Sequence, residues 1–187
     1  RERKRVIEEV YPIEVISLGG LAKKINEFKL VRETFYTPEF KSHFDRKLYA
    51  TFLSYYSAGN FAYDLKMNSD ERGSFTEILK TLNDGQVSVN ISKPGIIKGN
   101  HYHHTKTEKF VVVSGECEIK FRKIGAKEIF VYKVNGEKIQ AVDIPPGYTH
   151  SIKNIGTTDS VTIMWASEVF DKDNPDTYFE EVDINEQ

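Results

Sequence analysis

The sequence predicts a mainly β protein, a sandwich or barrel of short strands that is preceded by a short helical segment. Three observations predict this fold class. Apolar residues recur at steps of three and four before residue 57, short strand-like runs come after it, and turn residues separate those runs at close intervals. With 187 residues, of which 39% are apolar, the chain is long enough for one main domain with an appendage.

Two helices are predicted in the N-terminal segment. Ser17 can cap the first helix, in which apolar residues follow at helical steps: Leu18, Leu21, Ile25 and Phe28. The second is expected to begin near Pro38, and its apolar stripe comprises Phe40, Phe44, Leu48, Phe52 and Tyr56. Two helices this short cannot enclose a core, so we expect their stripes to pack on the second half, on another copy, or on a missing domain.

The composition changes at residues 57–60, which we interpret as a linker. Beyond it, alternating or β-branched runs predict strands at 86–92, 110–113, 118–122, 128–134 and 161–165. Turn residues separate these runs, and Asn135-Gly136 predicts a hairpin between two of them. Many short strands with regular turns indicate a sandwich or a barrel.

Composition and charge exclude several classes of protein. The formal net charge is −2, which gives no bulk attraction to nucleic acid or to an anionic membrane, and we expect neither as a partner. No stretch approaches the roughly 18 apolar residues of a membrane span. Cys117 is the only cysteine, so an intrachain disulfide and a thiolate metal cluster are both excluded. A reducing compartment fits this usage, and we expect a cytoplasmic protein.

Four residues have the spacing of a metal site. His101 and His103 alternate, so on an extended segment both imidazoles lie on one face. Glu108 opens the next predicted strand, and His150 follows a Pro-Pro-Gly turn that can direct it inward. Three neutral imidazoles and a carboxylate suit a first-row divalent ion. We expect Zn²⁺, with Fe²⁺ or Ni²⁺ as alternatives.

These segments resemble the paired motifs of the cupin family. Residues 95–115 match G-x5-H-x-H-x4-E-x6-G in full, and residues 145–154 match P-x-G-x2-H-x3-N. The second motif lacks its usual leading glycine, because Ile139 stands there. The resemblance covers roughly residues 61–182 and implies a double-stranded β-helix, or jelly-roll, barrel with a metal inside. It does not specify a reaction, since cupins include isomerases, dioxygenases, decarboxylases and binding modules.

Further runs resemble the sugar-nucleotide 3,5-epimerase cupins, which act on 4-keto-6-deoxy sugars: 70–77, 89–92, 98–102 and 108–110. More closely, residues 67–182 are similar to the C-terminal half of bifunctional enzymes of bacterial capsule synthesis. In those enzymes a cupin domain inverts C3 of a UDP-linked 4-keto-2-acetamido-2,6-dideoxy sugar. An N-terminal short-chain-dehydrogenase domain then reduces the C4 ketone with NADPH. The resemblance implies a cupin domain over residues 61–187 and a remnant of the dehydrogenase domain over residues 1–57.

The sequence has no nucleotide-binding signature of a reductase. No G-x-G-x-x-G turn occurs, and Tyr49 is followed four positions later by Leu53 instead of the lysine of short-chain dehydrogenases. We therefore predict no nicotinamide cofactor on this chain, with the reductase half absent. The chain also starts at Arg1 without a methionine, which suggests a processed product or a piece of a longer protein.

The implied reaction defines candidate catalytic residues. A base removes the proton α to the ketone, an electrophile stabilises the enolate oxygen, and a second group returns the proton on the opposite face. His101 matches both a metal ligand and the catalytic histidine of the epimerase cupins. We favour the ligand role, because a metal-bound imidazole is a poor proton acceptor. Lys109 or His104 is then the candidate base and Tyr148 the candidate acid. Whether the metal is catalytic or structural stays open.

Two further residues are candidates for substrate binding. Lys98 matches a basic position of the epimerase cupins. Arg72 lies in a segment that reaches a neighbouring subunit's pocket in those epimerases, so it can bind a substrate phosphate, and the same exchange favours a homodimer. The alternatives are a surface salt bridge for Arg72, solvated or packing roles for Lys98, Lys109 and Tyr148, and a His104 that points away from the pocket.

Three functions therefore compete. The first is C3 epimerisation of a UDP-sugar. The second is a non-haem iron dioxygenase, since three histidines and a glutamate also hold Fe²⁺ in cupins. The third is a non-catalytic module that binds a sugar or mediates dimerisation.

Overall fold

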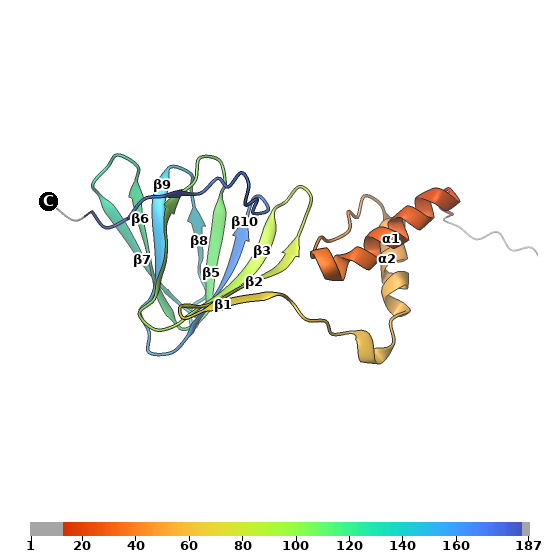
Figure 1. The fold of residues 1–187 in the computed structure, drawn as a ribbon, viewed down its shortest axis with the longest axis horizontal. Coiled ribbons are helices and arrows are strands. Elements are labelled where there is room, and N and C mark those ends of the chain that lie inside the picture. Colours follow the sequence, from red (N-terminus) through yellow and green to blue (C-terminus); the bar gives the residue numbers. More distant parts are fainter. Residues whose placement is uncertain (1–12, 185–187) are drawn as a thin grey trace, which may run out of the picture.

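The computed structural model describes residues 13–184, and it shows two facing antiparallel sheets with a two-helix segment at one end (Figure 1). One sheet has the strand order β1-β2-β3-β10-β5-β8, and the other has the order β11-β4-β9-β6-β7. The predicted fold class, a mainly β jelly-roll barrel preceded by short helices, is confirmed. Within the described residues, no helix combines the length and the apolarity that crossing a membrane requires.

The elements have the following bounds. The helices are α1 (Leu18–Thr34), α2 (His43–Ser54) and the single 3-10 turn η1 (Ala58–Asn60). The strands of the first sheet are β1 (Met67–Asp70), β2 (Gly73–Lys80), β3 (Gln86–Ser92), β10 (Ser160–Ala166), β5 (Glu108–Ser114) and β8 (Ala141–Ile144). Those of the second are β11 (Tyr178–Phe179), β4 (Ile97–Tyr102), β9 (Tyr148–Asn154), β6 (Glu116–Lys123) and β7 (Ile129–Asn135).

The two helices begin at capping residues. Ser17 caps α1 as predicted, because its Oγ accepts the Gly20 N–H at 3.1 Å. The predicted start of α2 near Pro38 is wrong. That helix begins after Ser42, whose backbone N–H donates to the Asp45 carboxylate at 2.9 Å while its Oγ accepts the Asp45 N–H at 3.2 Å. This reciprocal capping box satisfies free amides of the first turn, which nothing near Pro38 does.

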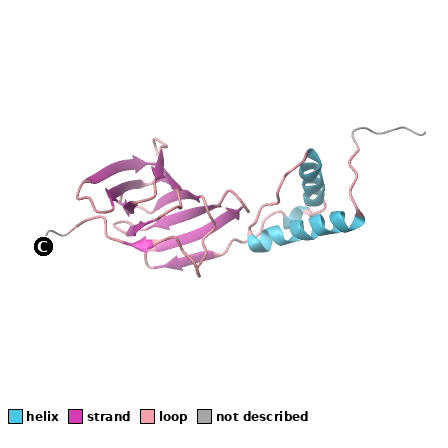
Figure 2. Ribbon diagram, turned by 90° about the horizontal axis from the view of Figure 1, so that it is seen from above, coloured by secondary structure: helices cyan, strands magenta, loops and turns pink. Residues whose placement is uncertain are grey.

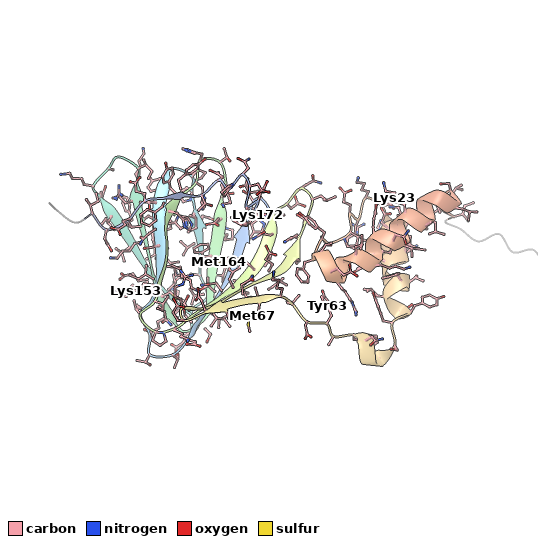
Figure 3. All side chains as sticks on the ribbon, in the orientation of Figure 1. Lys23, Tyr63, Met67, Lys153, Met164 and Lys172 are labelled. Atoms are coloured by element: carbon pink, nitrogen blue, oxygen red, sulfur yellow. The ribbon has the colours of Figure 1, made fainter. Side chains whose placement is uncertain are left out.

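The helices pack on each other through aromatic rings. The Phe28 ring centroid lies 5.0 Å from that of Tyr49 and 5.5 Å from that of Phe52. On the extended chain that leads to β1, the Tyr63 ring lies 4.8 Å below the Arg32 guanidinium (Figure 3). The helical segment therefore has a small aromatic core of its own, beside the sheets (Figure 2).

A short stretch after α1 joins the helical segment to the barrel. Phe35 ends α1 in a left-handed conformation with φ of 63°. Its carbonyl accepts the Lys80 N–H at 2.7 Å, and the Thr37 N–H donates to the Lys80 carbonyl at 2.8 Å. Residues 35–37 thus run along the end of β2, which brings Phe35 to the edge of the barrel interior.

The interior of the barrel is divided into an apolar part and a polar part. The apolar core comprises Phe110, Val112, Cys117, Ile119, Phe121, Val134, Val142, Ile144 and Ile152, with Met164 packed against it (Figure 3). The predicted alternation at 86–92 is confirmed in β3, where buried and half-buried residues alternate. The buried set is polar, however: Gln86, Ser88, Asn90 and Ser92. A polar interior wall is suited to a binding site.

The predicted hairpin at Asn135-Gly136 is wrong. β7 pairs with β6 and β8 pairs with β5, so the chain crosses here from one sheet to the other. The Asn135 side-chain oxygen accepts the backbone N–H groups of Glu137 at 3.0 Å and Lys138 at 2.9 Å. This local turn reverses the chain without pairing the strands on either side of it.

Candidate metal centre

A β-bulge in β4 turns His101 toward the barrel interior. Lys98 pairs with Ile152 of β9, and His101 pairs with His150, with a register shift between Gly99 and His101. In a regular strand, two residues three positions apart point to opposite faces. The register shift therefore allows both Lys98 and His101 to face inward. Gly99 has φ of 100°, and a Cβ there would lie 2.7 Å from the His150 carbonyl oxygen. The bulge therefore requires glycine.

Four side chains converge inside the barrel from three segments. His101 lies near the end of β4, and His103 directly follows that strand. Glu108 is the first residue of β5, and His150 lies in β9. One ligand atom from each lies within 4.8 Å of the others. The Glu108 Oε2 atom is 3.2 Å from His103 Nε2 and 3.3 Å from His150 Nε2. His103 and His150 are each 1% exposed. The four predicted ligands therefore form one cluster, in which His103 and His150 are buried and His101 and Glu108 are half-buried.

The donor set of this cluster fits a divalent cation. Within the described residues, the buried His150 Nε2 has no hydrogen-bond partner, although the Glu108 carboxylate lies 3.3 Å away. A buried polar atom without a partner is costly, and a metal ion would satisfy it. Three imidazole nitrogens and one carboxylate oxygen are a common set for first-row ions.

The protonation states also suit a cation. Burial, together with the neighbouring His150 and His103, lowers the pKa of His101 to about 4. Burial alone would raise the pKa of Glu108, but its hydrogen bond with His103 and the close approach of His150 hold this pKa below its usual range. At neutral pH His101 therefore has a free lone pair and Glu108 is a carboxylate.

Asp176 orients His103. The His103 Nδ1–H donates to the Asp176 backbone carbonyl, which leaves Nε2 directed at Glu108. The Asp176 carboxylate accepts the backbone N–H groups of His104, Thr105 and Lys106, each at 2.8 Å. Burial opposes its ionisation, yet these hydrogen bonds keep its pKa below the usual range. Sequence reasoning missed Asp176, because it lies 73 positions beyond His103 and belongs to neither motif.

A cavity of about 470 Å³ opens onto the cluster. Its lining includes three of the four ligand residues (His101, His103 and Glu108). Polar and aromatic residues complete the wall, among them Lys66, Asn68, Phe75, Glu77, Gln86, Lys106, Glu168, Phe170 and Thr177. Sequence reasoning left Glu77 and Gln86 unassigned. The alternation of β3 put Gln86 on one face with Ser88 and Asn90, but no signal in the sequence showed that this polar face is the buried one.

The three predicted catalytic residues do not line this cavity. Lys109 lies on the face of β5 opposite Glu108, and its ammonium pairs with Asp143 outside the barrel. His104 is exposed, with its ring centroid 4.6 Å from that of Tyr178. Tyr148 lines a separate cavity of about 720 Å³, which contains none of the four ligand residues. Lys109 points outward because successive residues of β5 alternate between the two faces of the sheet. The His104 ring points outward because hydrogen bonds to Asp176 hold the backbone of residues 104–106.

The two predicted substrate residues also lie elsewhere. The Lys98 ammonium donates to the Asn90 side chain at 2.6 Å and to the Ile91 carbonyl at 2.9 Å, and burial lowers its pKa. Arg72 lies in the turn between β1 and β2, where its guanidinium pairs with Asp70 at 2.6 Å. Within one chain these contacts match the alternatives considered for both residues, and binding of substrate by Lys98, or by Arg72 in a neighbouring subunit's pocket, stays a prediction.

Comparison with known proteins relates the chain to polysaccharide synthesis. Residues 68–178 match the family described as the polysaccharide biosynthesis C-terminal domain. Over 170 residues the chain is 46% identical to UDP-2-acetamido-2,6-beta-L-arabino-hexul-4-ose reductase of Pseudomonas aeruginosa, a match that covers 91% of this chain and 46% of that protein. It is 26% identical over 122 residues to the spore coat polysaccharide biosynthesis protein SpsL of Bacillus subtilis, covering 60% of this chain and 81% of SpsL.

A solved structure agrees with these sequence matches. The capsular polysaccharide assembling protein CapF of Staphylococcus aureus superposes with a TM-score of 0.87 at 55% identity. The match covers 88% of this chain and 45% of CapF. The chain thus spans less than half the length of the Pseudomonas aeruginosa protein and of CapF.

Proposed function

Because the chain belongs to the family of polysaccharide biosynthesis C-terminal domains, we propose that it is a metal-containing cupin that epimerises a sugar nucleotide. The proposed substrate is a UDP-linked 4-keto-2-acetamido-2,6-dideoxy sugar, inverted at C3 during synthesis of a capsular polysaccharide precursor. One observation carries the proposal: the cluster of three histidines and a glutamate faces, through His101, His103 and Glu108, a cavity of about 470 Å³, within the usual range for small-molecule sites. The relative in Pseudomonas aeruginosa is named for a UDP-linked 4-keto sugar, which supports this substrate class.

His101, His103, Glu108 and His150 would hold the ion, and we propose Zn²⁺, with Fe²⁺ or Ni²⁺ as alternatives. A bound divalent ion supplies either Lewis acidity toward a carbonyl oxygen or a structural link between β4, β5 and β9. The four ligands carry one negative charge in total when the three imidazoles are neutral. An occupied site would therefore have a net charge of +1, which favours an electron-rich oxygen in the cavity.

We assign the proton abstraction to Glu77. This residue faces the cavity from β2, and its carboxylate is 2.7 Å from the Lys80 ammonium. Glu108 is engaged by two imidazoles and Glu168 is exposed, so Glu77 is the remaining partly buried carboxylate of the cavity lining. In the proposed step the C3 proton passes to Glu77, and the C–H electron pair forms the enolate double bond. A solvent water then gives a proton to C3 from the opposite face, which restores the ketone with inverted configuration, and Glu77 returns its proton to solvent.

Solvent exchange tests the proposal directly. The metal-loaded chain, incubated in D₂O with the UDP-linked 4-keto sugar, is expected to incorporate deuterium at C3, and a chelator-treated sample reports the metal's contribution. Glu77→Gln is expected to reduce the exchange rate at least 100-fold, within the usual contribution of a general base. Glu137→Gln, far from the cavity in the turn after β7, is the matched control. Absence of exchange by the metal-loaded wild type would contradict epimerase activity.

The same ligand set favours a second candidate, a non-haem iron dioxygenase. Elemental analysis and O₂ consumption distinguish the two. A zinc-containing chain that consumes no O₂ supports the epimerase, whereas an iron-containing chain that consumes O₂ with a substrate supports the dioxygenase. A chain that binds the UDP-sugar without exchange or O₂ consumption would instead be a non-catalytic binding module.

We further propose that residues 1–57 are the end of a short-chain-dehydrogenase-like domain and that residues 61–187 are the cupin domain. Residues 1–12 and 185–187 of these ranges lie outside the described part of the structure. Large exposed apolar side chains on the helical segment, such as Val15 at 93% and Leu18 at 87%, support packing on a further domain. In a full-length protein that domain would carry the NADPH-dependent 4-reductase activity.

A homodimer remains part of the proposal. β1 pairs on one side only, with β2, so its outer edge offers backbone groups to a second copy. Sedimentation equilibrium tests this state, and a concentration-independent monomer mass would contradict it.

A further inference from the structure

Lys106 is a buried cation on the wall of the metal-site cavity. The residue is 6% exposed and lines the same cavity as His101 and Glu108. Within the described residues 13–184, its ammonium has one hydrogen-bond partner, the Thr177 hydroxyl at 2.9 Å. An ammonium has three N–H donors, so two are available to a ligand in the cavity.

The backbone around Lys106 is held in place by the C-terminal segment. The Lys106 N–H donates to the Asp176 carboxylate at 2.8 Å, and Asp176 also accepts the N–H groups of the two preceding residues. Thr177 follows Asp176 and orients the ammonium. The position of the cation is therefore fixed at both ends of its side chain, as a preorganised binding group requires.

No carboxylate within residues 13–184 forms an ion pair with this ammonium. Among the acidic residues of the cavity lining, Glu77 pairs with Lys80, Glu108 faces His103 and His150, and Glu168 is exposed. A buried charge whose only partner is neutral is unfavourable unless something else compensates it. The cavity itself is where a compensating anion can enter.

We propose that Lys106 and the metal cluster together form an oxyanion subsite, which takes the C4 oxygen of the 4-keto sugar as it gains negative charge. The assignment of this oxygen rests on the proposed epimerase function, but the subsite itself does not. Its ligand class is any carboxylate or enolate oxygen small enough to reach both the ion and the ammonium. Lys106 acts as a fixed hydrogen-bond donor in this subsite, and no proton transfer is assigned to it.

Acetate binding to the cobalt-substituted chain tests the subsite without any reaction. The visible spectrum of Co²⁺ changes when an anion enters its coordination sphere, so an acetate titration yields a Kd. Lys106→Met is expected to raise this Kd at least tenfold with unchanged cobalt content. Lys109→Met, the same change on the outer face of β5, is expected to leave it unchanged. Equal acetate affinity in Lys106→Met and wild type would overturn the proposal.

A second variant covers the case in which Lys106→Met does not fold. Thr177→Val removes the hydroxyl that orients the ammonium and retains the charge, so the acetate Kd is expected to rise about three- to tenfold. No rise in that variant would also contradict the subsite.

Deuterium exchange at C3 separates the two proposals. If the wild type shows no exchange but its acetate affinity depends on Lys106, the epimerase function fails and the subsite stands. If the wild type exchanges and Lys106→Met exchanges equally fast, the subsite assignment fails and the epimerase function stands.

Discussion

His103 donates its Nδ1 proton to the backbone carbonyl of Asp176, a residue 73 positions further along the chain. This single contact selects the ring tautomer that directs Nε2 toward Glu108. The Asp176 carboxylate in turn holds the loop that follows His103. The geometry of the metal cluster therefore depends on a segment that contributes no ligand to it.

Asp176→Ala is expected to accelerate metal release. Without the carboxylate, the loop from His104 to Lys106 loses three backbone hydrogen bonds and one from the Thr105 hydroxyl, and the carbonyl that orients His103 is no longer anchored. Partners of this kind change metal affinity about 10–100-fold. The release rate of zinc to a coloured chelator measures the effect. Asp171→Ala, at an exposed position outside the cavity lining, is the control, and equal rates in both variants would exclude the orienting role.

His150→Ala is expected to lower metal affinity by more than about 100-fold, beyond the range for partners that do not contact the ion. It removes a buried ligand that lies opposite His101 in the strand pairing. Because metal binding and folding are coupled, the melting temperature should fall too. Elemental analysis and calorimetry measure the two effects. His104→Ala is the matched control, since that ring packs outside the cluster against Tyr178, and full metal content in His150→Ala would remove His150 from the ligand set.

The metal-free chain is expected to lose stability between pH 7 and pH 5. The folded-state pKa of His101 is about 4, below its ordinary value of 6.5, so the unfolded chain binds more protons in this range. Stability from the neutral ring is complete above pH 6.5 and is lost as the pH falls toward 4. The loss at pH 5 is on the order of 2 kcal/mol.

Urea unfolding at pH 7 and pH 5 measures this loss. His101→Asn is expected to show a smaller difference between the two pH values, because the titrating ring is gone. Glu108 does not contribute in this window, since its shift acts below its ordinary value of 4.5. An equal pH dependence in wild type and His101→Asn would refute the assignment.

Gly99→Ala is expected to destabilise the chain more than Gly95→Ala. Both glycines have positive φ, 100° and 78°, so alanine adds backbone strain of about 1–2 kcal/mol at either position. At Gly99 the new Cβ would also lie 2.7 Å from the His150 carbonyl, whereas at Gly95 it meets nothing within 4 Å. We expect a total loss of about 3–4 kcal/mol for Gly99→Ala, with reduced zinc content, in chemical unfolding. Equal losses would show that the bulge tolerates a side chain.

Local patterns predicted the cluster, because the spacing of His101 and His103 and the start of the next strand at Glu108 are themselves local properties. The same rule of alternation should have excluded Lys109, since an inward Glu108 requires an outward Lys109. Lys106 lies in the intervening loop, where no periodicity predicts direction. Its burial depends on Asp176 and Thr177, which only the folded chain brings near.

The fold was predicted to a similar depth. Alternation in 86–92 identified β3, but no local signal showed that the strand after Asn135 would join the other sheet. Ser42 three positions before Asp45 is the local signal for the start of α2. The prediction relied on Pro38 instead and therefore placed the start too early. The periodicity of apolar residues predicts individual strands and helices, but it does not predict which strands pair or which distant residues come into contact.

The clamp on His103 also sets an order of events during synthesis. Asp176 leaves the ribosome 73 residues after His103, which at 5–20 residues per second is a delay of roughly 4–15 s. During that interval the first three ligands in the chain can meet an ion only with an unoriented His103 ring. A firmly held metal is therefore acquired late, when the nascent chain already includes the residues that follow β10.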